Sequence, residues 1–213
     1  MKKLLHVGCG RKRKEQTTAA FNTPDWKEIR LDIDVDVRPD IVGTLTDMAA
    51  VADGSVDAIF SSHNIEHLFP HEVPVALAEF RRVLSADGLV VVTCPDLKSV
   101  AKLIAEDKLT EPAYMSGMGP ITPLDILYGH RASVAAGNTY MAHRGGFTLK
   151  SLLRAFQGAG FESVAGLERP RSFDLWVIAS KAKIDDGALR ALAATHLPMP
   201  PVRKPAKAAA ATG

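Results

Sequence analysis

The fold is decided by LLHVGCG, residues 4–10, together with IRLDID, residues 29–34. The first stretch is a short apolar run closed by glycines, which is typical of a buried strand followed by a tight turn. The second alternates apolar with charged side chains, the pattern of a strand that buries one face. We therefore predict a strand that begins almost at residue 1, and a second strand over residues 28–37 whose end is acidic.

Further strands alternate with helices along the rest of the chain. Residues 72–84 carry apolar side chains at helical spacing, and Thr148 is suited to cap another helix, which Gly158 and Gly160 would end. We predict the other strands at residues 41–45, 56–61, 89–93, 161–167 and 173–181. This alternation predicts an α/β fold, a doubly wound and mostly parallel seven-stranded sheet covered on both faces.

The domain organisation follows from length and composition. The 213 residues, 46% of them apolar and 23% charged, suit one globular domain. Residues 97–146 interrupt the alternation with many glycines and prolines, and we interpret them as an irregular lid or substrate insertion with one or two short helices. The main domain, which contains this insertion, is then expected to end near residue 182. Residues 183–213 form a C-terminal extension, which we expect to be disordered from about residue 197 because the stretch from there on is rich in proline and lacks acids.

Charge and cysteine content restrict the partners and the compartment. Twenty-six Lys and Arg face 24 Asp and Glu, and a net charge of +2 supplies no field that would favour nucleic acid or a membrane surface. Cys9 and Cys94 are too few for a secreted disulfide framework, and both lie in apolar runs, where a free thiol packs as a small apolar side chain. This indicates a reducing compartment. No apolar run approaches the ~18–20 residues that cross a bilayer. We expect a cytoplasmic protein without a membrane or nucleic-acid partner.

The most informative motif is the glycine turn with a distant acid. Gly8 and Gly10 would let the backbone approach a ligand, and Asp32, 22 residues after Gly10, would end the next strand where a carboxylate can accept both ribose hydroxyls. A dinucleotide fingerprint wants a third glycine, but Arg13 stands at that position, which disfavours NAD and FAD. The motif therefore indicates a nucleoside, the alternative being an ordinary strand and turn.

Seven stretches of the sequence, in their order and spacing, resemble class I S-adenosylmethionine-dependent methyltransferases. The likeness is closest to small bacterial enzymes of the "methyltransferase domain 11" pattern, and it covers residues 3–182 apart from much of 97–142. It implies a Rossmann-like methyltransferase fold over residues 1–182, S-adenosylmethionine as cofactor, and methyl transfer. The stretches are LLHVGCG, IRLDID, PDIVGTL, DGSVDAIFSSHNIEHL, ALAEFRRVL, DGLVVVTCPD and HRGGFTLKSLLRAFQGAGFESV.

The resemblance also implies which residues hold the cofactor. Each of them is carried over from the family's motif to the matching position of this chain. Gly8, Cys9 and Gly10 would wrap the methionine moiety, Asp32 would hold the ribose hydroxyls, Ile33 would lie on an adenine face, Thr44 and Leu45 would lie at the adenine edge, and Ser62 and His63 would flank the methionine and sulfonium side.

Three observations keep alternatives open. His6 and Thr44 stand where the family usually has acidic or amide side chains, so one alternative is a protein that binds S-adenosylmethionine without turnover. The basic run Arg11 to Lys14 suggests an RNA-associated methyltransferase, although such a run is usually a solvated face. The first strand has no helices before it in the sequence given, so we expect the 97–146 insertion or a second subunit of a homodimer to cover the pocket.

The catalytic residues depend on the acceptor, because methyl transfer relies mainly on positioning. A base is needed only when the acceptor must lose a proton. His143 precedes a glycine pair in the segment that returns across the pocket mouth, and it is our candidate base or hydrogen-bond donor, the alternative being a structural loop histidine. Asp96 follows the residue 89–93 strand, and it either faces the ligand or caps the next helix.

The remaining candidates concern the acceptor and a metal. Tyr128, Tyr140 and Met141 would line an apolar acceptor pocket, unless they form the core of the insertion. His63, His67 and His71 have a spacing that invites a metal, but Pro70 interrupts the helix, and we expect no metal site. The predicted activity is O- or N-methylation of a small or medium-sized acceptor whose identity stays open.

Overall fold

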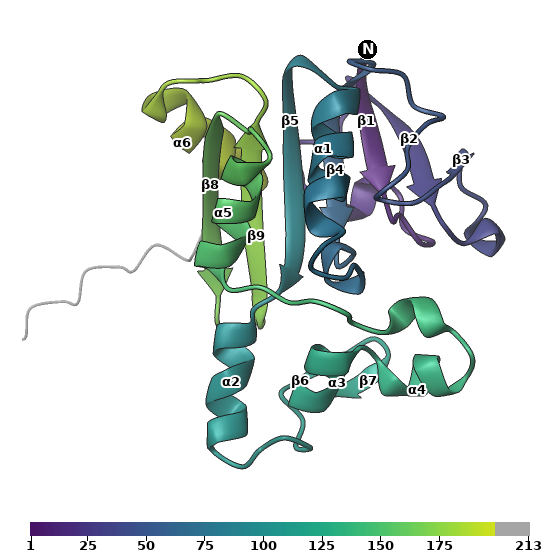
Figure 1. The fold of residues 1–213 in the computed structure, drawn as a ribbon, viewed down its shortest axis with the longest axis vertical. Coiled ribbons are helices and arrows are strands. Elements are labelled where there is room, and N and C mark those ends of the chain that lie inside the picture. Colours follow the sequence, from purple (N-terminus) through teal and green to yellow (C-terminus); the bar gives the residue numbers. More distant parts are fainter. Residues whose placement is uncertain (199–213) are drawn as a thin grey trace, which may run out of the picture.

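The computed structural model describes residues 1–198 and contains one sheet of seven strands (Figure 1). Its strand order is β3-β2-β1-β4-β5-β9-β8, and all neighbours pair in parallel except β9, which runs antiparallel to both β5 and β8. The predicted doubly wound, mostly parallel sheet is thus confirmed. The strands are β1 (Lys2–Val7), β2 (Trp26–Asp32), β3 (Ile41–Val42), β4 (Val56–Ser62), β5 (Leu84–Pro95), β8 (Ser163–Arg169) and β9 (Asp174–Ser180).

The core lies on both faces of the sheet because successive strand side chains point to opposite sides. In β5, Val90 and Val92 join the larger apolar cluster, whereas Val91 joins the cluster on the other face. Helices α1 (Val73–Val83) and α5 (Leu149–Gly158) cover the first face, toward the viewer in Figure 1. The second face is covered by α6 (Asp186–His196) and by the segment around Phe21.

Several strands have different limits from those predicted. The second strand ends at Asp32 rather than residue 37, because the Asp34 side chain accepts the Asp36 N–H and starts the 3₁₀ turn η2 (Val35–Val37). Strand β3 has two residues instead of five. Strand β5 begins directly after α1, since Leu84 pairs with Val56 before the register shifts.

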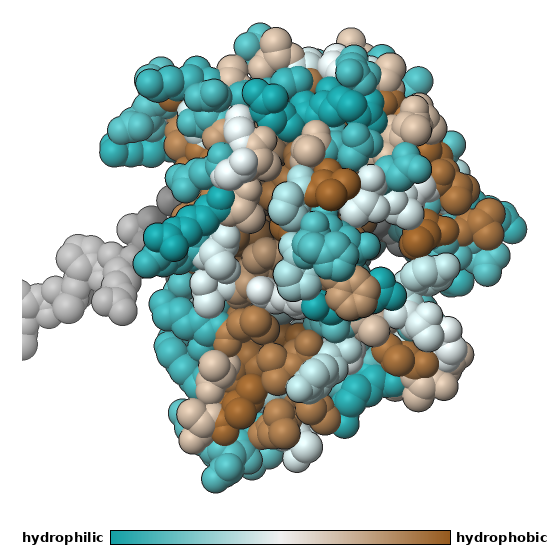
Figure 2. Space-filling view, in the orientation of Figure 1, coloured by the Kyte–Doolittle hydropathy of each residue, from teal (hydrophilic) through white to brown (hydrophobic). Residues whose placement is uncertain are grey.

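The insertion is more regular than predicted and lies beyond the carboxyl ends of the parallel strands (Figure 1). It forms its own small core around Val100, Ile121 and Ile126. Asp125 stabilises it, because its carboxylate caps a helix with Thr122 and lies 2.8 Å from Arg131 Nε. Figure 2 shows apolar side chains gathered over this lower part of the molecule. Its elements are α2 (Leu97–Ala105), β6 (Tyr114–Ser116), β7 (Gly119–Ile121), α3 (Pro123–Tyr128), α4 (Arg131–Ala135) and η4 (Thr139–Met141).

The C-terminal extension is partly ordered. Helix α6 packs against β8 and β9, and Leu197 is 6% exposed in the cluster that contains Phe21. Disorder from about residue 197 is therefore wrong for Leu197, which buries an apolar side chain that composition alone did not reveal. The predicted disorder of residues 199–213 lies outside the described residues. Within residues 1–198, none of the helices has the length and apolar character required to span a membrane.

Candidate active site

The turn after β1 contains two glycines with different surroundings. Both have positive φ angles, +60° at Gly8 and +52° at Gly10, which L-residues adopt at a cost. A Cβ on Gly8 would lie 2.0 Å from Asn64 Oδ1, whereas a Cβ on Gly10 would meet no atom within 4 Å. Gly8 therefore makes room for a protein side chain. Gly10 leaves backbone open to a ligand.

Asp32 lies beside this turn at the end of β2, as predicted. Its Oδ2 accepts the Gly10 N–H at 2.7 Å, and its Oδ1 accepts the Asp34 N–H at 2.9 Å. Each carboxylate oxygen has a second lone pair, so both can still accept a hydroxyl. The open glycine backbone and the acid are thus joined at one edge of the sheet.

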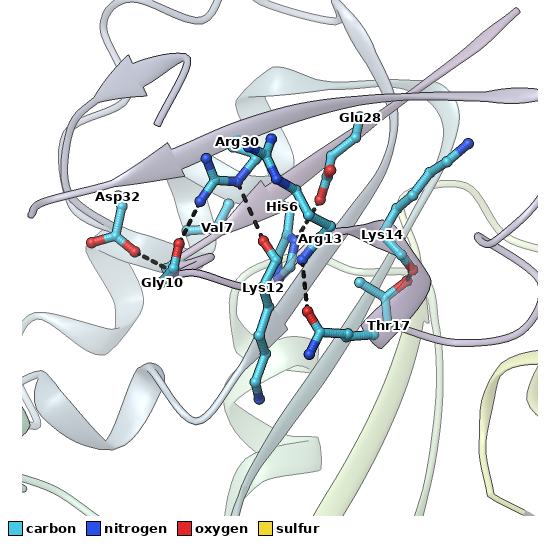
Figure 3. Close-up of polar contacts among 12 residues, drawn as sticks. His6, Val7, Gly10, Lys12, Arg13, Lys14, Thr17, Glu28, Arg30 and Asp32 are labelled. Carbon is cyan, nitrogen blue, oxygen red and sulfur yellow. Dashed lines mark hydrogen bonds and ion pairs between the residues drawn. The ribbon is translucent and has the colours of Figure 1, made fainter. Parts of the chain in front are cut away.

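Arg30 also holds this turn, as Figure 3 shows, and it was missed by sequence reasoning. Its buried guanidinium donates to the carbonyl oxygens of Gly10, Lys12 and Arg38. Alternation assigned Arg30 to the charged face of its strand, and no residue pattern indicated that the loop carbonyls would cover it. Arg30 therefore fixes the turn without occupying the ligand side.

The remaining predicted cofactor residues surround this edge with varied exposure. Ile33 is 43% exposed after β2, whereas Cys9 is buried, and burial raises the pKa of the Cys9 thiol to about 11. The Ser62 hydroxyl pairs with that of Thr93 at 2.8 Å. Two further residues, Thr44 and Leu45, lie in the partly buried segment after β3.

A second group of polar side chains lies where the insertion returns to the sheet. The turn η3 (Ile65–His67) follows β4, and the backbone N–H groups of Arg144 and Gly145 donate to Glu66 O at 2.9 and 3.0 Å. This brings His143 beside His67, with ring centroids 5.0 Å apart. His143 thus lies beside the turn that follows β4, and its place at a pocket mouth stays a prediction.

The electrostatics of this group centre on Glu66. Burial alone would raise the pKa of the Glu66 carboxyl, but the neighbouring histidines, His63 foremost, outweigh it and hold the pKa below its ordinary value. Desolvation would lower the pKa of His63, and Glu66 outweighs that effect and raises it. Burial lowers the pKa of His143, which favours its neutral form.

Comparison with known proteins relates the chain to methyltransferases. Residues 5–92 match a family model described as a methyltransferase domain. An S-adenosylmethionine-dependent methyltransferase from Archaeoglobus fulgidus has 16% identity, with 84% of this chain and 86% of that chain covered and a TM-score of 0.56. The chain therefore carries a methyltransferase-domain match over residues 5–92 and has the fold of S-adenosylmethionine-dependent methyltransferases.

Other solved structures share the fold of this chain. The 1,6-didemethyltoxoflavin-N1-methyltransferase of Burkholderia thailandensis, solved with 1,6-didemethyltoxoflavin and S-adenosylhomocysteine, has 16% identity over 85% of this chain and 71% of that chain, with a TM-score of 0.52. A putative methyltransferase in complex with the Haloferax volcanii Trm112 activator has 15% identity over 85% and 83%, with a TM-score of 0.51. No curated protein sequence matches the chain.

The structure also describes His6 and Thr44, the two positions that the sequence analysis set apart from the family pattern. His6 Nδ1 lies 2.8 Å from Glu28 Oε1, and desolvation lowers the pKa of His6 although Glu28 opposes the shift. A carboxylate thus lies next to the position where the family usually has one, supplied by the neighbouring strand. The Thr44 hydroxyl pairs with that of Thr46 at 3.1 Å.

The predicted catalytic and acceptor residues have distinct environments. Asp96 is buried as the N-cap of α2, where it accepts the Lys98 N–H at 3.0 Å and the Ser99 hydroxyl. The capping role is therefore observed, and the catalytic role of Asp96 stays a prediction. Tyr128 and Tyr140 are more than half exposed on the insertion, and Met141 is partly buried there. Their part in an acceptor pocket also stays a prediction.

Proposed function

We propose that the protein transfers a methyl group from S-adenosylmethionine to oxygen or nitrogen of a small or medium-sized acceptor in the cytoplasm. One observation carries this proposal: the open backbone at Gly10 and the paired carboxylate of Asp32 share the sheet edge that the insertion adjoins (Figure 1). The insertion lies beyond the carboxyl ends of the parallel strands. The small acceptor in the Burkholderia thailandensis relative supports an acceptor of this size.

The proposed cofactor contacts fit the geometry of the edge. Gly8, Cys9 and Gly10 would surround the methionine moiety, and the free lone pairs of Asp32 would accept the ribose hydroxyls. The exposed side chain of Ile33 is available to pack on an adenine face. The other assigned contacts are Thr44 and Leu45 at the adenine edge and Ser62 and His63 at the sulfonium side.

Catalysis by this arrangement rests on position. When bound, S-adenosylmethionine supplies an activated methyl group with a neutral leaving group, and well-aligned reactants can account for ~7–11 kcal/mol of barrier. His143 donates Nδ1–H to the Ile126 carbonyl at 2.8 Å, which leaves Nε2 with a free lone pair. In this neutral form, His143 can accept a proton from an acceptor hydroxyl or hold it in place.

The basic run gives little support to an RNA-associated enzyme. Lys14 Nζ donates to the carbonyls of Thr23 and Trp26, at 2.7 and 2.9 Å, so this lysine anchors the loop. Arg11, Lys12 and Arg13 are exposed. An RNA acceptor would be recognised by association that weakens steeply with salt.

The test combines binding with an acceptor search. Calorimetry with S-adenosylhomocysteine should show binding by the full chain, and incubation of cell extract with methyl-labelled S-adenosylmethionine should label material in the small-molecule fraction. Binding without labelling of any fraction would favour a protein that has lost turnover. Label confined to nucleic acid would overturn the small-acceptor proposal.

A further inference from the structure

Glu66 is a buried carboxylate without a hydrogen-bonded partner. Its residue is 1% exposed, and neither carboxylate oxygen accepts a hydrogen bond. These two oxygens are the only buried side-chain polar atoms in that condition among residues 1–198. His63 Nδ1 lies 3.3 Å from Oε1 as an ion-pair contact. A buried carboxylate whose oxygens accept no hydrogen bond is unfavourable, and His63 contacts only Oε1, so a cation is a ligand that this carboxylate can still accept.

Two histidines direct nitrogen atoms toward the same point. One ligand atom from each of Glu66, His67 and His143 lies within 4.8 Å of the other two. The segments that carry them are held together by the two backbone hydrogen bonds onto Glu66 O. The three groups are therefore gathered before any ligand arrives.

The histidine tautomers suit metal binding. His67 Nδ1 lies 3.1 Å from the Ala142 carbonyl, and His143 Nδ1 lies 2.8 Å from the Ile126 carbonyl. A carbonyl oxygen only accepts, so both Nδ1 atoms carry the proton and both Nε2 atoms keep a free lone pair. Metal-binding histidines are oriented in this way by backbone carbonyls.

We propose that Glu66, His67 and His143 bind a divalent transition-metal ion of the zinc class. Two imidazoles and one carboxylate form a ligand set that such ions accept, and three protein ligands leave a fourth position for water or another oxygen. His63, whose side chain is 47% exposed, lies at the open side of this group. From the sequence we considered His63, His67 and His71 and expected no metal site, whereas the group proposed here takes its second histidine from the insertion.

The fourth coordination position would give the metal a role in methyl transfer. This part of the inference rests on the proposed function. Asn64, two residues before Glu66, donates to the Gly8 carbonyl at 3.2 Å, so the metal group adjoins the cofactor turn. His143 Nε2 would then bind the metal instead of acting as the base, so an acceptor hydroxyl on the metal would release its proton to water, and the oxygen lone pair would form the bond to the methyl carbon. The carbon–sulfur bond would break with its electron pair retained by sulfur. The acceptor class is accordingly a compound with an oxygen donor, methylated on that oxygen.

Metal binding is tested without cofactor or acceptor. The full chain is treated with chelator, dialysed, and titrated with Co²⁺, whose visible absorption reports nitrogen ligation, and with Zn²⁺ in a calorimeter. We expect one ion per chain, with affinity at least 10-fold weaker in Glu66→Gln and in His143→Ala. The matched control is His71→Ala, because His71 is exposed, stacks on Phe69 and lies outside the group. This control should bind the ion as the unaltered protein does.

Thermal denaturation separates a metal ligand from a structural residue. Without metal, Glu66→Gln should melt at a somewhat lower temperature than the unaltered chain, because it loses the ion-pair contact with His63. Added Zn²⁺ should raise the melting temperature of the unaltered protein and not that of Glu66→Gln. Equal Zn²⁺ affinity in the two proteins, or an equal loss in His71→Ala, would overturn the metal site. Failure of S-adenosylhomocysteine binding would instead overturn the proposed function and leave the metal result intact.

Discussion

Gly8 and Gly10 share one turn, but alanine at each should affect a different property. Gly8→Ala should mainly lower the free energy of unfolding, and Gly10→Ala should mainly lower the affinity for S-adenosylhomocysteine. Gly10→Ala places its methyl group where no protein atom lies within 4 Å, so its effect on stability is the strain of a positive φ, about 1–2 kcal/mol. The same methyl group projects from the open backbone that we assign to the methionine moiety. Affinity for S-adenosylhomocysteine should fall at least 10-fold, about 1.4 kcal/mol.

Gly8→Ala adds a clash to the same strain. Its Cβ would lie 2.0 Å from Asn64 Oδ1, so the amide would move away from the carbonyls of Val7 and Gly8, to which it donates at 3.0 and 3.2 Å. With about 0.5–1.5 kcal/mol for each lost hydrogen bond, the free energy of unfolding should fall by roughly 2–5 kcal/mol.

Urea denaturation and calorimetry with S-adenosylhomocysteine measure the two effects. In an Asn64→Ala background the additional loss from Gly8→Ala should shrink toward that of Gly10→Ala, because the clashing amide is gone. The reasoning is refuted if Gly10→Ala destabilises the protein more than Gly8→Ala does, or if Gly10→Ala binds S-adenosylhomocysteine with unaltered affinity.

The other predictions concern separate parts of the molecule. Asp32→Ala should weaken S-adenosylhomocysteine binding by ~1.5–3 kcal/mol in calorimetry, since it removes a charged acceptor; unchanged affinity in a folded variant would remove Asp32 from the ribose role. Leu197→Ala should lower the free energy of unfolding by about 2–5 kcal/mol in urea denaturation, because Leu197 is buried in the second cluster. Desolvation lowers the pKa of His196 from 6.5 to about 4, so the unfolded chain binds more protons between these values; stability should fall as pH drops through this window, and less so in His196→Gln. Hydrogen exchange in residues 110–146 should slow with S-adenosylhomocysteine if the insertion closes as a lid, and equally slow exchange without ligand would refute closure. His143→Ala should lower turnover more than cofactor affinity, and intact turnover would return His143 to a structural role.

Local patterns in the sequence determined most of the sheet. Apolar runs and alternation placed the strands because a strand's side chains change face at each residue, a relation between neighbours in the chain. Thr148 was recognised as a helix cap for the same reason, since its partner Ser151 is three residues away. Gly10 and Asp32 were expected to lie close together because the motif places them at the ends of two neighbouring strands.

Tertiary structure alone decided the contacts made across long loops. Arg30 lies within a charged alternation, and only the return of the glycine turn covers it with carbonyl oxygens. The group around Glu66 joins residues of one turn to His143, which the insertion brings back, while the local spacing pointed to His71 instead. Leu197 is buried because it packs into the apolar cluster on the second face of the sheet, which contains Phe21. The free energy of such contacts depends on how distant segments pack together, and no short window of sequence contains both partners.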